Sequence, residues 1–230
     1  MKRAIGIFLA ASTVGLFAAT DASAADPAPA GPAGAIQYRP PLRGAPAVRI
    51  GGATRSLARA APAFTYLAPD HVGVSLRSQP TLYWHAAEPP VADMLFRLTA
   101  MDGASAAVEH VLPARACAGL YRVRLADLGI AIRAEVDYRW QVVLAGAQGR
   151  VSAVSGWLRL GDAIPGYAER LRGAALGERA RMLAEAGVWY DAVDELMAQA
   201  ASPEASVALG SLLEQGGMPP GIAEAPACFR

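Results

Sequence analysis

Apolar and polar side chains alternate with a period of two through most of residues 63–162. Successive side chains of a β-strand point to opposite faces, so this alternation predicts short strands that each bury one face. Turn and breaker residues, such as those at 88–90, separate the alternating runs. The expected strands cover residues 80–85, 94–100, 108–112, 120–125, 138–144 and 151–160, with the weakest assignments between 102 and 119.

The alternation also predicts which side chains form the core. We expect Leu82 and Trp84 on the buried face of their strand and Tyr83 on the opposite face. In the later strands the expected core residues are Met94, Phe96, Leu98, Tyr138, Trp140, Val142 and Leu144. Seven or so short strands within about 100 residues predict a mainly β fold, an antiparallel immunoglobulin-like β-sandwich domain at 63–162.

Ile132 and Tyr138 have a spacing that resembles the tyrosine corner of immunoglobulin-like and fibronectin-type-III sandwiches. In such a corner the phenol hydroxyl bonds to the backbone a few residues upstream and ties a crossover to the core. The resemblance therefore implies a backbone partner for the Tyr138 hydroxyl.

Beyond Asp162 apolar residues recur at helical spacing, which predicts an α-helical tail of three to four short helices. They are expected at 167–172, 178–186, 189–200 and 203–215. Ser202 followed by Pro203 is typical of a helix start, and Gly216 of a helix end. One helical hairpin resembling a tetratricopeptide repeat is indicated by Gly187, Trp189, Ala192 and Leu196. We expect a helical hairpin region at 163–217 and a flexible C-terminal tail at 218–230.

The first residues have the pattern of a secretory signal peptide. A basic start at Met1 to Arg3 precedes an apolar stretch of about sixteen residues and small residues that end near Ala24 or Ala25. The apolar stretch is shorter than the roughly 20 residues that a spanning helix needs. The sequence thus predicts a signal peptide at 1–25, a periplasmic or secreted protein, and no transmembrane helix after cleavage.

Residues 26–62 are rich in Pro, Gly and Ala and predict an extended arm. Tyr38 and Leu42 are possible anchors, so the arm is either a spacer or a docking peptide that lies on this or another domain. The arm carries five arginines against one aspartate, whereas 163–230 carries five against nine acids. Opposite charges at the two ends indicate either solvated surfaces or attraction of the arm to the tail or to the envelope. The candidate partner-binding residues are Arg39, Arg43, Arg49, Arg55, Trp189 and Tyr190, and packing at the sandwich–helix junction is the alternative for the last two.

Cys117 and Cys228 are the two cysteines of the chain. An exported chain enters an oxidising compartment, where a pair of cysteines is readily oxidised, so one disulfide is a candidate. Neither cysteine belongs to a CxxC motif or lies beside a histidine at ligand spacing, which argues against a redox or metal role.

Motifs that carry chemistry are missing from the sequence. His71, His85 and His110 stand singly, so no metal site is predicted. There is no nucleophile elbow of the GxSxG type, and the acids at 127, 135 and 137 fall where turns are expected. We therefore predict no catalytic, cofactor or metal residue and no enzymatic activity, and export argues against nucleic acid as a partner.

The motifs YRPP, RGAP, GGATR, LAPDHVG, PTLYW, YRWQVVL and GVWYDAV occur in this order along the chain. Together they resemble the bacterial domain-of-unknown-function family 928 over nearly the whole chain that follows the signal peptide. The family's glycine-rich stretch usually reads GGGTRG, and here Ala53 and Ser56 replace two glycines. The resemblance implies the arm, sandwich and tail architecture and export, and it implies no particular mechanism.

Two hypotheses for function follow. The first is a non-catalytic interaction or adaptor module that binds another envelope protein through the arm and the helical tail. The second is a module that binds cell-envelope glycan, with Tyr83, Trp157 or Trp189 as exposed stacking platforms.

Overall fold

A computed structural model of the chain describes residues 36–41, 64–145, 151–163 and 166–229. The expected signal peptide and most of the expected arm, including Arg43, Arg49 and Arg55, lie outside the described residues. The described strands are β1 (Phe64–Tyr66), β2 (Val72–Ser75), β3 (Thr81–Ala86), β4 (Met94–Ala100), β5 (Val108–Leu112), β6 (Gly119–Arg124), β7 (Asp137–Ala145) and β8 (Val151–Leu160). The helices are η1 (Leu125–Leu128), α1 (Tyr167–Gly173), α2 (Leu176–Glu185), α3 (Trp189–Met197), α4 (Pro203–Gln215) and η3 (Ile222–Glu224).

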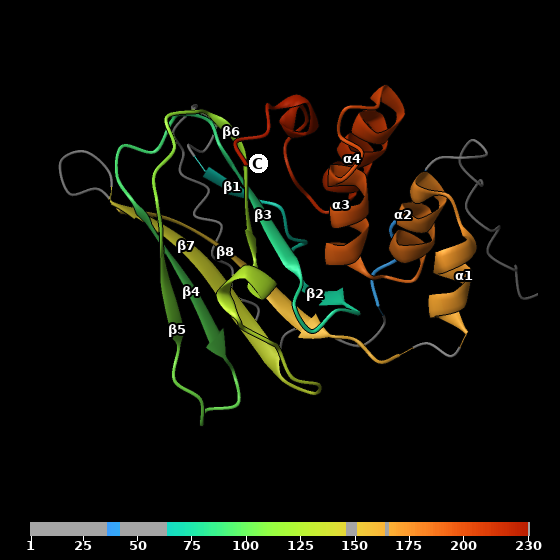
Figure 1. Ribbon diagram of the computed structural model, residues 1–230, viewed down its shortest axis with the longest axis horizontal. Coiled ribbons are helices and arrows are strands. Elements are labelled where there is room, and N and C mark those ends of the chain that lie inside the picture. The colour runs from blue at the N-terminus through green and yellow to red at the C-terminus, as the bar shows by residue number, and fades with distance from the viewer. Residues whose placement is uncertain (1–35, 42–63, 146–150, 164–165, 230) are drawn as a thin grey trace, which may run out of the picture. The chain divides into compact units, whose positions relative to one another are not determined.

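The strands form two sheets. The smaller sheet has the order β1-β3-β6, and the larger has the order β2-β8-β7-β4-β5. All neighbours are antiparallel except β2, which pairs in parallel with β8. The strands precede the four α-helices (Figure 1), which confirms the predicted mainly β fold with a helical tail. The strand order also suggests the predicted immunoglobulin-like sandwich.

The side chains that the alternation assigned to the core are buried where the structure describes them, and the Leu144 side chain lies outside that description. Phe96 and Trp140 are fully buried, and Met94 and Leu98 are each 2% exposed. Tyr138 is buried as well, and its hydroxyl accepts a hydrogen bond from the Arg133 amide at 3.1 Å. The bond expected of a tyrosine corner is therefore present.

One predicted face is wrong. Tyr83 was expected to point away from the core, but it is only 2% exposed, and Thr81 on the same side is also buried. The reason is that α3 covers this face of β3. The helix packs against β2 and β3 (Figure 1), and its Asp194 accepts a 2.7 Å hydrogen bond from the Tyr83 hydroxyl. The strand β3 is therefore buried on both faces.

The helices begin and end close to the predicted residues. Ser202 caps α4, since its hydroxyl accepts a 3.2 Å hydrogen bond from the Ala205 amide, and Gly216 follows the last turn. The helix α3 ends at Met197 rather than at residue 200, because residues 198–202 form the turn that leads into α4. No helix in the described ranges is long and apolar enough to cross a membrane.

The predicted flexible C-terminal tail is wrong for residues 218–229. Met218, Ile222 and Cys228 are buried, and η3 packs against α4. The segment then runs beside β6, where the Leu120 amide donates to the Pro226 carbonyl and the Cys228 amide donates to the Leu120 carbonyl. Apolar side chains and backbone hydrogen bonds thus hold in place a segment that was predicted to be flexible.

Candidate functional site

The first turn of α3 fastens the helices to the sandwich. The Trp189 indole nitrogen donates to the Leu67 carbonyl at 3.1 Å. The Tyr190 hydroxyl accepts from the Trp140 indole nitrogen at 2.8 Å and donates to the Trp157 carbonyl at 2.6 Å. These bonds are made in the interior, so the junction is a continuous core rather than a linker between two bodies.

This geometry corrects the predicted partner-binding roles of Trp189 and Tyr190. They are 0% and 1% exposed, and their polar atoms bond to the sandwich, so they are unable to anchor a partner. Trp189 and Tyr83 are excluded as stacking platforms for glycan by the same burial. Trp157, the third candidate platform, is half-buried.

Trp140 reaches Tyr190 because β8 has a glycine opposite it. A Cβ atom added to Gly156 would lie 2.6 Å from the Trp140 indole nitrogen and 2.7 Å from the Ala68 Cβ atom. Only a residue without a side chain leaves room for the indole there, so Gly156 is required by close packing.

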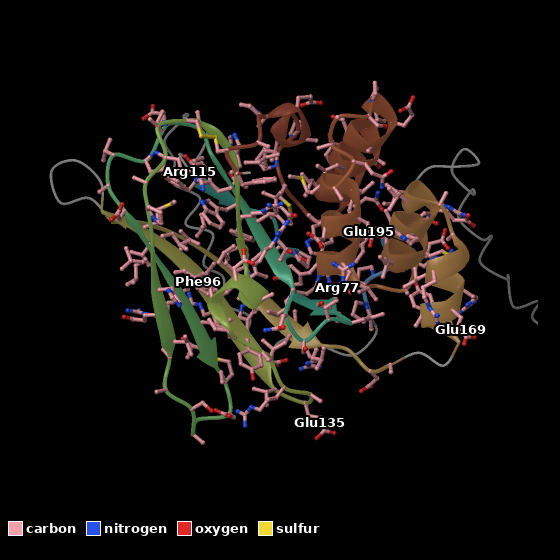
Figure 2. All side chains as sticks on the ribbon, in the orientation of Figure 1. Arg77, Phe96, Arg115, Glu135, Glu169 and Glu195 are labelled. Carbon is pink, nitrogen blue, oxygen red and sulfur yellow. A yellow bond between two sulfur atoms is a disulfide. The ribbon has the colours of Figure 1, made fainter. Side chains whose placement is uncertain are left out.

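A group of charged residues surrounds this junction on the α3 side. The Asp191 carboxylate accepts from the Ser75 hydroxyl at 2.6 Å and from the Leu76 amide at 2.9 Å. Arg77 forms ion pairs with Asp194 and Glu195, and Figure 2 shows Arg77 near the end of β2 and Glu195 on α3. Burial raises the pKa of the Asp191 carboxyl above its ordinary value. The carboxylates of α3 thus hold the β2–β3 turn in place.

The N-terminal segment Ile36–Pro41 lies on the helices in a seam that we define by Ala184, Gln215 and His71. The Gln215 side chain accepts from the Tyr38 amide at 2.8 Å and donates to the Ile36 carbonyl at 3.1 Å. The Arg39 amide donates to the Ala184 carbonyl at 3.1 Å. Gln215 therefore binds the two backbone groups that lie side by side along one edge of an extended chain, as a neighbouring strand would.

Tyr38 is the main side-chain anchor of this segment. Its hydroxyl lies 2.7 Å from His71 Nε2, and His71 Nδ1 lies 3.0 Å from the Asp70 carboxylate. The Tyr38 ring meets the edge of Trp189, with 4.9 Å between ring centroids, and Tyr38 itself is 7% exposed. Burial, with the Asp70 charge, raises the pKa of Tyr38.

Gly187 completes the seam. It has a positive φ of 76°, and an added Cβ atom would lie 2.8 Å from the Arg39 carbonyl oxygen, so a larger residue would displace the segment. Of the candidate arginines of the arm, Arg39 is described, and its side chain is exposed. The arm thus behaves, over the described residues, as a peptide docked on its own domain.

A cleft of about 370 Å³ opens between the β2–β3 turn and helices α1, α2 and α3. We call it the α1 cleft; its lining includes Leu76, Arg77, Tyr167, Leu171, Arg172 and Leu183. Tyr167 is 6% exposed, and its hydroxyl has no hydrogen-bond partner in the described part of the chain. A buried hydroxyl without a partner is unusual and is costly to maintain.

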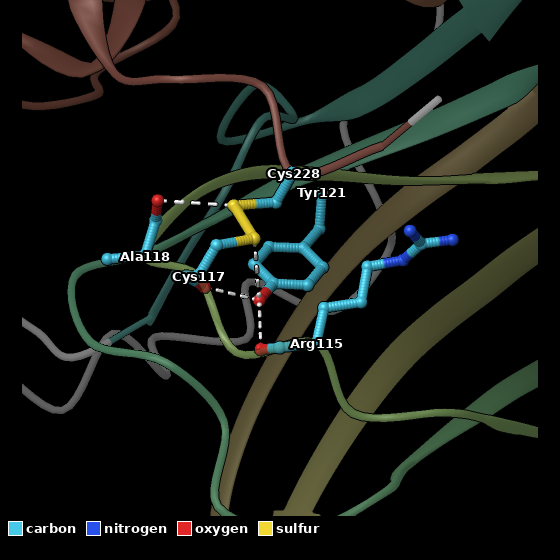
Figure 3. Close-up of a disulfide and its surroundings, with 5 residues drawn as sticks. All are labelled: Arg115, Cys117, Ala118, Tyr121 and Cys228. Carbon is cyan, nitrogen blue, oxygen red and sulfur yellow. Dashed lines mark hydrogen bonds between the residues drawn. A yellow bond between two sulfur atoms is a disulfide. The ribbon is translucent and has the colours of Figure 1, made fainter.

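A disulfide joins Cys117 and Cys228, whose Cα atoms are 6.1 Å apart (Figure 3). Beside it the Tyr121 hydroxyl lies 2.5 Å from the Cys117 carbonyl oxygen and 3.1 Å from that of Arg115. The bond connects the loop before β6 to the C-terminal segment, which gives it a structural position.

Sequence patterns did not reveal Gln215, Arg77 or Asp191. The helical spacing of Asp191, Asp194 and Glu195 indicates one acidic face, but it does not identify the partners on that face. The partner atoms are distant in the chain, 116 residues away for Asp191 and Ser75 and 177 for Gln215 and Tyr38.

The fold and the site define a β-sandwich protein with a helical unit built into its core and an N-terminal segment docked on that unit. Residues 50–227 match the family model described as Domain of Unknown Function (DUF928), which is more than half of the chain, and the chain belongs to this family. The family predicted from the sequence motifs is thereby confirmed. No curated protein matches the chain at a significant level.

Proposed function

We propose that the protein is an exported, non-catalytic interaction module of the cell envelope, in which the helices and the docked arm together bind another envelope protein. The observation that supports this proposal is the seating of Ile36–Pro41 in the seam. Three hydrogen bonds to its backbone and two buried side chains hold this part of the arm beside the acidic helices. A partner would meet residues 36–41, with the exposed Arg39, and the helices as one surface.

The chemistry of the junction favours binding over catalysis. Asp191 is engaged by Ser75 and Leu76, and its role there is to hold the turn. His71 is engaged by Tyr38 and Asp70, and burial raises the pKa of Tyr38, which opposes its use as a nucleophile or base. The groups that come together thus have structural partners.

The test uses the exported full-length chain with a photo-reactive residue in place of Val207, which is 74% exposed on α4. The seam variant combines Tyr38→Ala with Gln215→Ala. The control variant is Gln141→Ala on β7, whose register partners are Arg97 and Ser155. We expect crosslinks to discrete envelope proteins in the parent and the control, and loss of most of this yield in the seam variant.

Unchanged crosslinking in the seam variant would reject the proposed surface. Retention on isolated cell wall is measured in parallel, because the glycan hypothesis predicts binding to wall material that is independent of the seam. Retention without any protein crosslink would replace the interaction module with a glycan-binding one.

A further inference from the structure

The apolar lining of the α1 cleft is suited to an aliphatic group. Its apolar lining consists of Leu76, Ala163, Ala168, Leu171 and Leu183. The volume of about 370 Å³ lies near the lower end of the roughly 300–1,000 Å³ found for ligand pockets. It equals the share of about a dozen water molecules at ~30 Å³ each, and a methylene group is of similar size, so one chain of about ten carbons fits.

The most exposed charge of the cleft lining is positive. The Arg172 side chain is 76% exposed, whereas Arg77, which is 47% exposed, is already paired with Asp194 and Glu195. The acids of the lining lie deeper, since the Glu195 side chain is 12% exposed and Asp191 is 3% exposed. Glu195 is already paired with Arg77 and Arg179, at 3.0 Å and 2.8 Å.

Arg172 is weakly held by the protein. Its ion pair with Glu169 measures 3.8 Å and its Nε donates to the Ala168 carbonyl at 3.4 Å, both long contacts. Figure 2 shows Glu169 on α1, and its side chain is 79% exposed. The Arg172 guanidinium can therefore reorient toward an anion at the cleft, because the contacts that it would lose are weak.

Tyr167 supplies a second, independent observation. It begins α1 and lines the cleft, and its hydroxyl is buried without a partner in the described ranges. The Arg170 guanidinium lies 5.3 Å from the centre of its ring and covers it. A ligand oxygen is the kind of group that would satisfy this hydroxyl.

We propose that the α1 cleft binds a small aliphatic carboxylate, with its single chain against the apolar walls and its carboxylate at Arg172. Guanidinium groups recognise carboxylates through paired, charge-assisted hydrogen bonds, which favours this head group over an alcohol or an amine. A peptide is less suited, because its backbone amides would be buried against aliphatic walls that offer them no partner. This site does not rest on the proposed function, since it shares no residue with the seam.

The experiment is calorimetric titration of the mature protein with decanoate, below the concentration at which decanoate forms micelles. Ala168→Trp fills the cleft from an exposed position of α1, and Arg172→Gln removes the charge. The matched controls are Ala198→Trp and Arg181→Gln, which lie outside the cleft lining. We expect one decanoate per chain, no binding to Ala168→Trp, about tenfold weaker binding to Arg172→Gln, and no change in either control.

Three further probes separate the sources of affinity. Acetate carries the head without the chain, decyltrimethylammonium carries the chain with the opposite charge, and a leucine tripeptide carries a carboxylate on a peptide backbone. Each is expected to bind far more weakly than decanoate. The proposal is overturned if decanoate does not bind, if the cation or the tripeptide binds as well as decanoate, or if Ala168→Trp and Arg172→Gln both bind like the parent. Should Ala168→Trp lose its fold, Arg172→Gln alone decides.

Discussion

Trp140 stabilises both the sandwich core and the junction with the helices. It is fully buried in β7, and its indole nitrogen donates to Tyr190 of α3. We expect Trp140→Ala to cost about 3–5 kcal/mol against a total stability of about 5–15, measured by urea unfolding. The matched control is Trp157→Ala in β8, where the half-buried indole should cost clearly less. A Trp140 variant within about 1 kcal/mol of the parent would contradict the packing described.

Asp191 gives the junction a pH dependence opposite to that of most carboxylates. Burial raises its folded pKa above the ordinary value near 3.9 for an unfolded aspartate, so the folded state binds the proton more tightly. Its contribution to stability is fully present below about pH 3.9 and is lost as pH rises through the folded pKa.

The comparison of the parent with Asp191→Asn isolates this group. The free energy of unfolding of the parent minus that of the variant should fall as pH rises from about 4, because only the parent has an ionisable group at position 191. Urea unfolding at several pH values between about 4 and 7 measures it. A difference that stays constant or grows with pH would mean that the bonds from Ser75 and Leu76 outweigh burial.

At the scale of residues, the core could be predicted from the sequence, whereas the contacts between the sandwich and the helices could not. Trp140 and Tyr138 follow from alternation, since a period of two determines which side chains share a face. Asp191 and Gln215 follow from no local pattern, because each bonds to a segment more than 100 residues away in the chain. Local periodicity contains no information about such partners.

At the scale of elements, β3 and the C-terminal segment show the same limit. Alternation predicted one buried face for β3, whereas Tyr83 on the other face is covered by α3. The sequence of the strand does not show that a helix distant in the chain packs on its second face. Residues 218–229 were likewise expected to be loose, and their hydrogen bonds to β6 come from the tertiary fold.

The disulfide should stabilise this C-terminal segment measurably. Cys117 and Cys228 are separated by 111 residues, and in the chain-entropy model a loop of about 100 residues is worth roughly 4.7 kcal/mol. We expect the combined variant Cys117→Ala and Cys228→Ala to lose about 2–5 kcal/mol in urea unfolding. Thiol titration of the protein under denaturant should detect no free thiol, and two reactive thiols per chain would contradict the pairing.

At the scale of the whole molecule, the sandwich and the helices share one core. Trp140 bonds to Tyr190, Leu67 to Trp189, and Cys228 returns the chain to the β6 edge. We therefore expect a chain that ends at residue 162 to lack cooperative unfolding, as followed by circular dichroism during heating. A truncated chain that unfolds in one sharp transition near the temperature of the parent would show that the sandwich is independent of the helices.

Residues 36–41 of the arm form one surface with the helices, because they are docked in the seam. Native-state hydrogen exchange at the Tyr38 and Arg39 amides tests it most directly, since these amides donate to Gln215 and to the Ala184 carbonyl. Both amides should be protected from exchange in the full-length protein, and Gln215→Ala should selectively expose the Tyr38 amide. Exchange of both amides at the rate of an unstructured chain would contradict it.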